Sequence, residues 1–263
     1  MKTWKVTLEY DGTKYHGWQE QLNARTVQGE LRKAVEAAFG CKVDMQGSGR
    51  TDSGVHALAQ VAHVKLMKAP SGLGDLRFVQ RKINDALPTD ICVLSLEDAR
   101  PAFHARHDAV SRTYLYQIST RRTAFAKRFV WWIKEDLDLK AMARAASLLP
   151  GRHDFAAFAA ADPSRPGEST IVVVNNAELG VEDYLVLFRI EASHYLWKMV
   201  RRVVGVLVKV GRGEVTEEQV HELLQGSPVE GLEVAAWTAP ASGLFLEAVE
   251  YREGAKEERG RGR

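Results

Sequence analysis

A glycine-rich segment between two strand-like runs reads Gln46-Gly47-Ser48-Gly49-Arg50-Thr51-Asp52-Ser53-Gly54-Val55-His56-Ala57. Glycine adopts backbone conformations closed to other residues and lets a ligand come close to the main chain. Three glycines around Asp52 therefore predict an exposed loop of fixed shape that presents one carboxylate. Arg50 lies two positions before this acid, and Asp52 is the first candidate for a catalytic residue.

Other interpretations of this loop can be compared with known motifs. Asp-Ser-Gly is an ordinary turn sequence, because an Asp side chain can bond its own backbone two residues on. A phosphate-binding P-loop requires a lysine and a following helix, which this stretch lacks, and the dinucleotide fingerprint fails on its glycine spacing. The tripeptide Asp52-Ser53-Gly54 matches the aspartic-protease motif, but that chemistry needs two carboxylates and the chain has no second copy. Only a homodimer with one copy per subunit would allow it.

The composition predicts a globular protein with a substantial core. The chain has 263 residues, 45% of them hydrophobic, and no apolar stretch approaches the length of a membrane span. The first residues, Met1-Lys2-Thr3-Trp4-Lys5-Val6, lack the apolar segment of a signal peptide. We therefore expect a cytoplasmic protein.

The sequence predicts no metal site. The two cysteines, Cys41 and Cys92, have neither metal-site nor redox spacing. His104 and His107 lie three positions apart, but no acidic or cysteine residue lies nearby at the spacing of a metal site.

Charge alone does not identify a partner. Lysine and arginine total 36 against 34 acidic residues, and a net charge of +2 does not by itself indicate a nucleic-acid binder. Any basic surface must come from uneven placement, for which residues 121–128 and 198–212 are candidates. Residues 252–263 are charged and nearly free of apolar side chains, so we expect a disordered tail there.

Apolar periodicity divides the first half of the chain into six elements. Residues 4–10 alternate apolar and polar side chains, the two-residue period of a half-buried strand. Between a Thr26 cap and Gly40, apolar residues recur at helical spacing. The expected order is strand, helix, strand, strand, helix and strand, at residues 4–10, 27–39, 41–45, 59–66, 74–87 and 91–96.

The second half repeats this order of elements, with one additional helix. The expected strands are residues 110–119, 171–179, 184–190 and 244–251, and the expected helices are residues 139–149, 196–210 and 217–224. An α+β fold of two ferredoxin-like, RRM-like βαββαβ halves fits this order, with antiparallel sheets flanking a central active-site cleft. We place the halves at residues 1–104 and 105–251, with the cleft at their seam near residues 99–108.

Arg201 is a charged residue in an apolar setting. The predicted helix 196–210 carries an apolar stripe, and most neighbours of Arg201 three and four positions away are apolar. An unpaired charge on the flank of such a stripe is costly, so Arg201 should have an acidic partner. A structural ion pair with any carboxylate explains this arginine nearly as well as a pair with Asp52.

The strand expected at residues 110–119 places Arg112, Tyr114 and Tyr116 on one face. Aromatic and cationic side chains on an open sheet form a common platform for RNA. Tyrosines also favour half-buried strands for structural reasons, which is the better interpretation for Tyr116.

Many motifs of the chain, in order, resemble the A-type tRNA pseudouridine synthases over almost its whole length. The matching segments are Glu9-Tyr10-Asp11-Gly12, Tyr15-His16-Gly17-Trp18-Gln19, Thr26-Val27-Gln28, Gly49-Arg50-Thr51-Asp52-Ser53-Gly54-Val55-His56-Ala57, Asn84, Leu87-Pro88, Phe103-His104-Ala105-Arg106, Arg112-Thr113-Tyr114-Leu115-Tyr116, Asp154-Phe155, Phe158, Met199-Val200-Arg201, Ala239-Pro240 and Gly243-Leu244.

The resemblance implies roles for individual residues. It makes Asp52 the catalytic nucleophile, pairs Arg201 with it, and places Tyr114 against the target base. Arg50 is then associated with the flipped nucleotide and its phosphates. By the same resemblance we place Thr51 and His56 of the same segment in the substrate-binding site.

The resemblance also implies the reaction and the partners. Uridine would be isomerised to pseudouridine in the anticodon arm of tRNA, at positions 38, 39 and 40, by an intramolecular transferase that requires no cofactor and no metal. The family is dimeric, which implies a homodimer that binds tRNA across both subunits. Two departures concern tRNA contacts: Lys198 stands where many members have histidine, and residues 168–171 lack a commonly found arginine.

A non-catalytic RNA-binding protein with two sheet platforms is the main alternative, with Asp52 as a turn residue. Arg201 discriminates between the two, because a binding module has no evident reason to direct an arginine from an apolar helix flank toward a loop aspartate.

Overall fold

The computed structural model describes residues 2–68, 73–161 and 167–252. Its strands are β1 (Lys2–Tyr10), β2 (Val43–Gly47), β3 (His56–Leu66), β4 (Ile91–Asp98), β5 (Ala109–Ser119), β6 (Trp131–Trp132), β7 (Gly151–Asp154), β8 (Ile171–Glu182), β9 (Leu185–Ala192) and β10 (Leu244–Tyr251). Its α-helices are α1 (Val27–Phe39), α2 (Leu76–Ala86), α3 (Leu139–Ala146), α4 (Met199–Gly211) and α5 (Glu217–Leu223). Except for Arg252, the expected tail lies outside the described residues.

One sheet runs through both halves of the chain. Its strand order is β4-β1-β3-β10-β5-β9-β8-β7, with β2 paired to β3 and β6 paired to β5. Strand β3 joins the halves because its two ends pair differently: residues 62–66 pair with β2, and His56 and Ala57 pair in parallel with β10. The α+β class is confirmed, but the sheet is continuous where we expected two.

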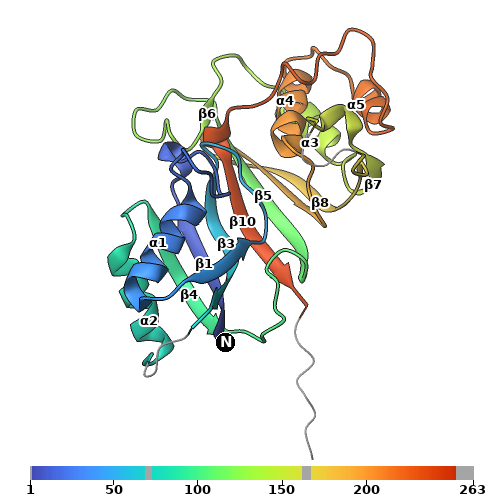
Figure 1. Cartoon of the computed structure of the whole chain (residues 1–263). Coiled ribbons are helices and arrows are strands. Elements are labelled where there is room, and N and C mark those ends of the chain that lie inside the picture. Colours follow the sequence, from blue (N-terminus) through green and yellow to red (C-terminus); the bar gives the residue numbers. More distant parts are fainter. Residues whose placement is uncertain (1, 69–72, 162–166, 253–263) are drawn as a thin grey trace, which may run out of the picture.

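The two halves use their strands in the same order. In the first half the order is β4-β1-β3-β2, and in the second it is β10-β5-β9-β8, with antiparallel pairs throughout both. Figure 1 shows α1 and α2 together beside the strands of the first half, and α3, α4 and α5 gathered at the opposite end of the sheet.

Strand β1 and helix α1 form as their local sequence predicts. The alternating side chains of β1 bury Trp4, Val6 and Leu8 completely. Helix α1 begins where the Thr26 hydroxyl accepts a hydrogen bond from the Gly29 amide, and it ends at Gly40, whose φ of 63° is in the left-handed region.

The main hydrophobic cluster extends through both halves, and a small second cluster contains Val61, Phe103 and Ala105. The apolar stripe of α4 is buried in the main cluster, as the helical period predicts, and each such side chain stabilises the fold by roughly 1.5–3 kcal/mol. In the part of the chain that the structure describes, no helix combines the length and apolar character needed to cross a bilayer.

Several element boundaries differ from expectation, and two short strands were not expected. Strand β3 begins at His56 and not at residue 59, since β10 pairs with its first residues. Helix α4 begins at Met199 and not at residue 196, because Lys198 has a left-handed φ of 62°. The short strands β6 and β7 were not predicted, and each is held by pairing with a long strand.

Candidate active site

The loop between β2 and β3 is held firmly at both ends. At its start, the Ser48 amide donates to the Val61 carbonyl at 2.7 Å, and the buried Gln60 side chain bonds Ser48 Oγ and the Gly49 carbonyl. Further along, the Trp18 amide donates to the Thr51 carbonyl at 3.1 Å. The predicted loop of fixed shape therefore rests on contacts to β3 and to the segment after β1.

Two glycines outside the loop allow this close approach. A Cβ on Gly12 would lie 1.9 Å from the Val55 carbonyl oxygen, and one on Gly17 would lie 2.5 Å from the Thr51 carbonyl oxygen. Gly17 also has a φ of +89°, which side chains other than glycine rarely adopt. The backbones of the two segments therefore touch directly.

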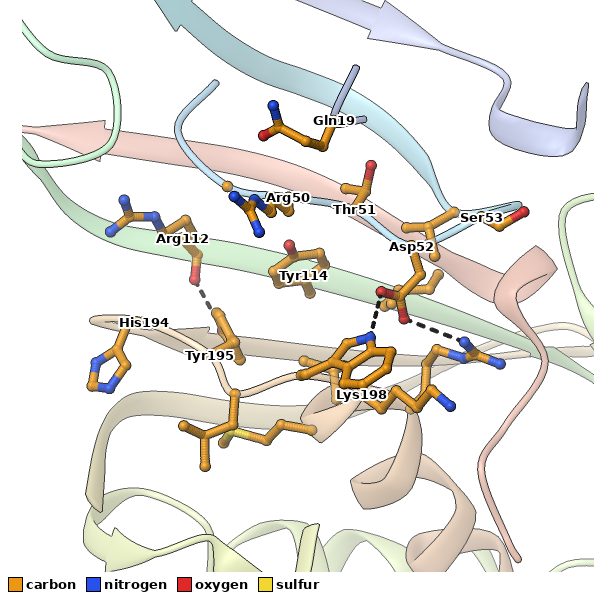
Figure 2. A pocket seen from close by; sticks show the side chains of 18 of the residues that line it. Gln19, Arg50, Thr51, Asp52, Ser53, Arg112, Tyr114, His194, Tyr195 and Lys198 are labelled. Carbon is orange, nitrogen blue, oxygen red and sulfur yellow. Dashed lines mark hydrogen bonds and ion pairs between the residues drawn. The ribbon is translucent and has the colours of Figure 1, made fainter. Parts of the chain in front are cut away.

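Asp52 receives a donor on each carboxylate oxygen. The indole Nε1–H of Trp197 donates to Oδ1 at 3.1 Å, and Nη1 of Arg201 donates to Oδ2 at 3.4 Å (Figure 2). The Asp52 side chain keeps 28% of its surface exposed. One carboxylate thus remains accessible from the cavity while its orientation is fixed.

Arg201 is positioned by α4 and by the segment before β10. Its Nε donates to the Ala239 carbonyl at 2.7 Å, and its own carbonyl accepts from the Ala239 amide at 3.0 Å. The side chain is 17% exposed, so its charge is only partly screened. The predicted acidic partner of Arg201 is Asp52.

A cavity of about 440 Å³ opens in front of Asp52. We call it the Asp52 cavity; its walls are the loop 48–53, the segment 194–201 and the strand β5. Figure 2 shows Tyr114 at its centre, between Arg50 and Asp52 on one side and Tyr195 on the other. From the expected seam near residues 99–108, only Arg106 lines this cavity.

The charge of the cavity wall is strongly positive. Its described lining residues include one carboxylate, that of Asp52. The cationic lining residues are Arg50, Arg106, Arg112, Lys198 and Arg201. Such a wall attracts an anionic ligand.

Tyr114 contributes an aromatic surface and a hydroxyl to the cavity. Its ring packs edge-on against Tyr195, with centroids 4.9 Å apart, and the residue is 8% exposed. Burial, with smaller effects from Tyr10 and Asp52, raises the pKa of Tyr114 well above its usual value. The hydroxyl is therefore protonated at neutral pH.

Arg112 is buried beneath the cavity without a carboxylate partner among the described residues. Its guanidinium donates to the carbonyl oxygens of Ser193 at 2.9 Å, Ser48 at 2.9 Å, Arg106 at 2.7 Å and Ala109 at 3.4 Å. Burial lowers its pKa. One arginine thus ties together three segments of the cavity wall.

The residues expected to bind substrate occupy different environments. Arg50 is exposed at the cavity edge, and it makes no ion pair or hydrogen bond with any other described residue. The Thr51 hydroxyl lies in the lining but bonds the Tyr10 hydroxyl at 2.8 Å.

His56 lies behind the loop and does not line the cavity. It is 1% exposed; Nδ1 accepts from the Gly12 amide at 3.0 Å, and Nε2 lies 3.0 Å from the Arg128 carbonyl. Burial lowers the pKa of His56. In this structure the neutral ring supports the loop and presents no free nitrogen to a ligand.

Tyr116, on the same face of β5, is fully buried, and its hydroxyl donates to the Pro240 carbonyl at 2.8 Å. The structural interpretation of this tyrosine is confirmed.

Sequence reasoning missed Trp197 and Tyr195 as parts of the site. Both come just before α4, where the left-handed Lys198 directs the chain across Asp52. A tryptophan two positions before the Met199-Val200-Arg201 motif was the available signal.

Within the described residues, no three His, Cys, Asp or Glu side chains are arranged to hold a metal ion. The His104 and His107 rings contact each other at 4.1 Å, and His104 Nδ1 accepts hydrogen bonds from backbone amides.

Comparison with known proteins places this fold and site in a family. The family model described as tRNA pseudouridine synthase matches residues 7–108 and 145–252. A tRNA pseudouridine synthase A of Thermoanaerobacter sp. (strain X514) is 38% identical over 254 residues, covering 95% of this chain and 100% of the relative. The protein of the same name from Acetivibrio thermocellus is 37% identical, with 95% and 100% coverage. That from Citrifermentans bemidjiense is 38% identical, with 96% and 99% coverage.

The Asp52–Arg201 pair therefore lies in a protein of an RNA-modifying class of enzymes. The chain belongs to the tRNA pseudouridine synthase family, a family of isomerases.

Proposed function

We propose that this chain isomerises uridine to pseudouridine in the anticodon arm of tRNA, at positions 38–40, with Asp52 as the nucleophile. The observation that carries the proposal is the pair of Asp52 and Arg201 at the wall of an otherwise cationic cavity. Such a cationic wall attracts a polyanionic RNA. The Asp52 carboxylate faces the part of the RNA that enters the Asp52 cavity.

The reaction needs one carboxylate and no change of oxidation state. The bond from N1 to the sugar breaks, the base turns, and a bond from C5 to the same sugar carbon forms. The proton that leaves C5 is balanced by one gained at N1, so product and substrate are isomers. Asp52 would add to the sugar or the base and be released when the new bond forms.

Arg201 and the buried tyrosine have complementary tasks in this scheme. Arg201 donates to Oδ2 of the carboxylate and places a positive charge 3.4 Å from it. Tyr114 offers a protonated hydroxyl and an aromatic surface, so it can stack on the base or donate a hydrogen bond to it.

The target uridine must leave its stack to enter a cavity of this size. Arg50, exposed at the edge and without a partner among the described residues, is placed to bind a phosphate of the flipped nucleotide. Thr51 lines the same edge, whereas His56 acts on substrate only through the loop that it supports.

The assembly and location follow the same proposal. We infer a cytoplasmic homodimer that binds tRNA across both subunits, as the family resemblance implies. The shared strand order of the halves supports two ferredoxin-like units, at residues 1–104 and 105–251.

Position-resolved detection of pseudouridine tests the proposed substrate. A tRNA transcript with uridines at positions 38–40 and elsewhere is treated with the protein, and pseudouridines are mapped by carbodiimide modification and primer extension. The proposal expects stops at positions 38–40 and none with a transcript that carries cytidine there. Stops only outside the anticodon arm would overturn the assigned substrate site, and tight binding without any stop would favour the RNA-binding alternative.

A further inference from the structure

Trp197 donates the shorter of the two hydrogen bonds to Asp52. Its Nε1 lies 3.1 Å from Oδ1, whereas Arg201 Nη1 lies 3.4 Å from Oδ2. The residue is 44% exposed, so core packing does not account for a large aromatic side chain at this point. The hydrogen bond to the Asp52 carboxylate accounts for the tryptophan at this position.

The main chain around Trp197 is fixed. Its carbonyl accepts a hydrogen bond from the Ala160 amide at 2.9 Å, which ties it to the loop after β7. Lys198, the next residue, has a φ of 62°, and Asp183 is the other described non-glycine residue with positive φ. Backbone strain of this kind persists where the surroundings require it.

The indole ring is also held on its face. The Lys198 ammonium lies 5.0 Å from the centroid of the Trp197 ring. The Asp52 carboxylate meets the ring at its N–H edge, so the aromatic group is held between a cation and an anion.

Two donors on two oxygens restrict rotation of the carboxylate. Each carboxylate oxygen has two lone-pair positions, so one donor on each leaves acceptor sites free toward the cavity. Without the hydrogen bond from Trp197, the Asp52 carboxylate could rotate so that Oδ1 points away from the reacting atom. A nucleophile held in a single orientation reacts faster than one that samples several.

We propose that Trp197 is a positioning residue that orients the Asp52 carboxylate for attack through its indole N–H. The proposal rests on the proposed function of Asp52 as nucleophile. It assigns to Trp197 a role in the chemical step and not in tRNA binding.

Two substitutions separate the N–H from the aromatic surface. Trp197→Phe keeps an aromatic ring but has no donor. Trp197→His restores a donor, since the imidazole ring superposes on the five-membered ring of indole and Nε2 takes the place of Nε1. Trp132→Phe is the matched control, because Trp132 is similarly exposed at 42%, is contacted by Arg122, and does not line the cavity.

The assay is the single-turnover rate of pseudouridine formation with saturating enzyme, together with the dissociation constant for the tRNA. Trp197→Phe is expected to lower the rate roughly tenfold, the size of one hydrogen bond to a charged group at a partly exposed site. The dissociation constant for the tRNA should stay within about twofold, because the lost hydrogen bond is made to Asp52 and not to the tRNA. Trp197→His should recover part of the rate, and Trp132→Phe should match the wild type.

Other outcomes overturn the proposal. A wild-type or faster rate for Trp197→Phe would show that the N–H is dispensable or that the indole blocks the carboxylate. A normal rate with weaker binding would make Trp197 a stacking surface for RNA. Activity of Asp52→Ala would instead remove the proposed function itself, so the two failures are distinguishable.

Discussion

Replacing Arg201 by methionine should slow the reaction while leaving the fold in place. At a separation of 3.4 Å and an effective dielectric constant of about 20, the Arg201–Asp52 attraction is about 5 kcal/mol. The two side chains are 17% and 28% exposed, and screening by water leaves about 2 kcal/mol of this. That energy corresponds to a roughly 30-fold lower rate.

The assay is pseudouridine formation at saturating tRNA for wild type, Arg201→Met and Arg201→Lys. Lysine keeps the positive charge but cannot bond both Ala239 and Asp52 in the same way, so its rate should lie between the other two. Arg212→Met is the matched control, because Arg212 follows α4 directly and pairs with Glu135 at 2.8 Å outside the cavity.

Circular dichroism and filter binding should show that Arg201→Met is folded and binds tRNA. A rate within about threefold of wild type for this variant, with Asp52→Asn inactive, would show that the ion pair does not contribute to the reaction. An equal loss of activity in Arg212→Met would show that the effect comes from the helix and not from the pair.

Three further predictions concern the support of the site. Burial lowers the pKa of His63, which is 2% exposed, to about 4 from 6.5, so the folded state binds this proton less readily than the unfolded state. The stability that the neutral His63 ring contributes is present above pH 6.5 and is lost as pH falls toward 4. Between pH 7 and 4.5, urea titrations should therefore show that wild type loses about 2 kcal/mol more unfolding free energy than His63→Asn. Gly12→Ala should destabilise the fold by about 1–3 kcal/mol and lower activity, because its Cβ would meet the Val55 carbonyl, whereas Gly180→Ala, with open space around it, should match wild type in thermal unfolding and activity. Arg112→Met should cost about 3 kcal/mol of unfolding free energy in urea, because four carbonyl oxygens lose a charged donor; a loss below 1 kcal/mol would mean that water replaces it fully.

Local patterns predicted the elements that depend on local sequence. The alternation in β1 and the Thr26 and Gly40 caps of α1 are properties of neighbouring residues, and the structure confirms them. The acidic partner of Arg201 was also predictable, because a charge on an apolar helix flank requires one.

Features that depend on distant pairing were not predictable from these patterns. The single sheet results from β10 pairing with the first residues of β3, about 190 positions earlier in the chain. The same limit applies to Trp197, whose contact with Asp52 requires the left-handed turn at Lys198. His56 was expected to contact substrate, but the backbone of Gly12 binds it from behind the loop.

We propose Asp52 as the nucleophile of a uridine isomerisation. The most direct measurement is tritium release from C5 of uridine in a tritiated tRNA transcript, comparing wild type with Asp52→Asn at equal tRNA occupancy. The substitution keeps the size of the side chain and removes its charge, and the loop remains anchored by Gln60 and Trp18. We predict release by wild type and none above background by Asp52→Asn. Release by the variant at a rate near wild type would show that Asp52 is not the nucleophile.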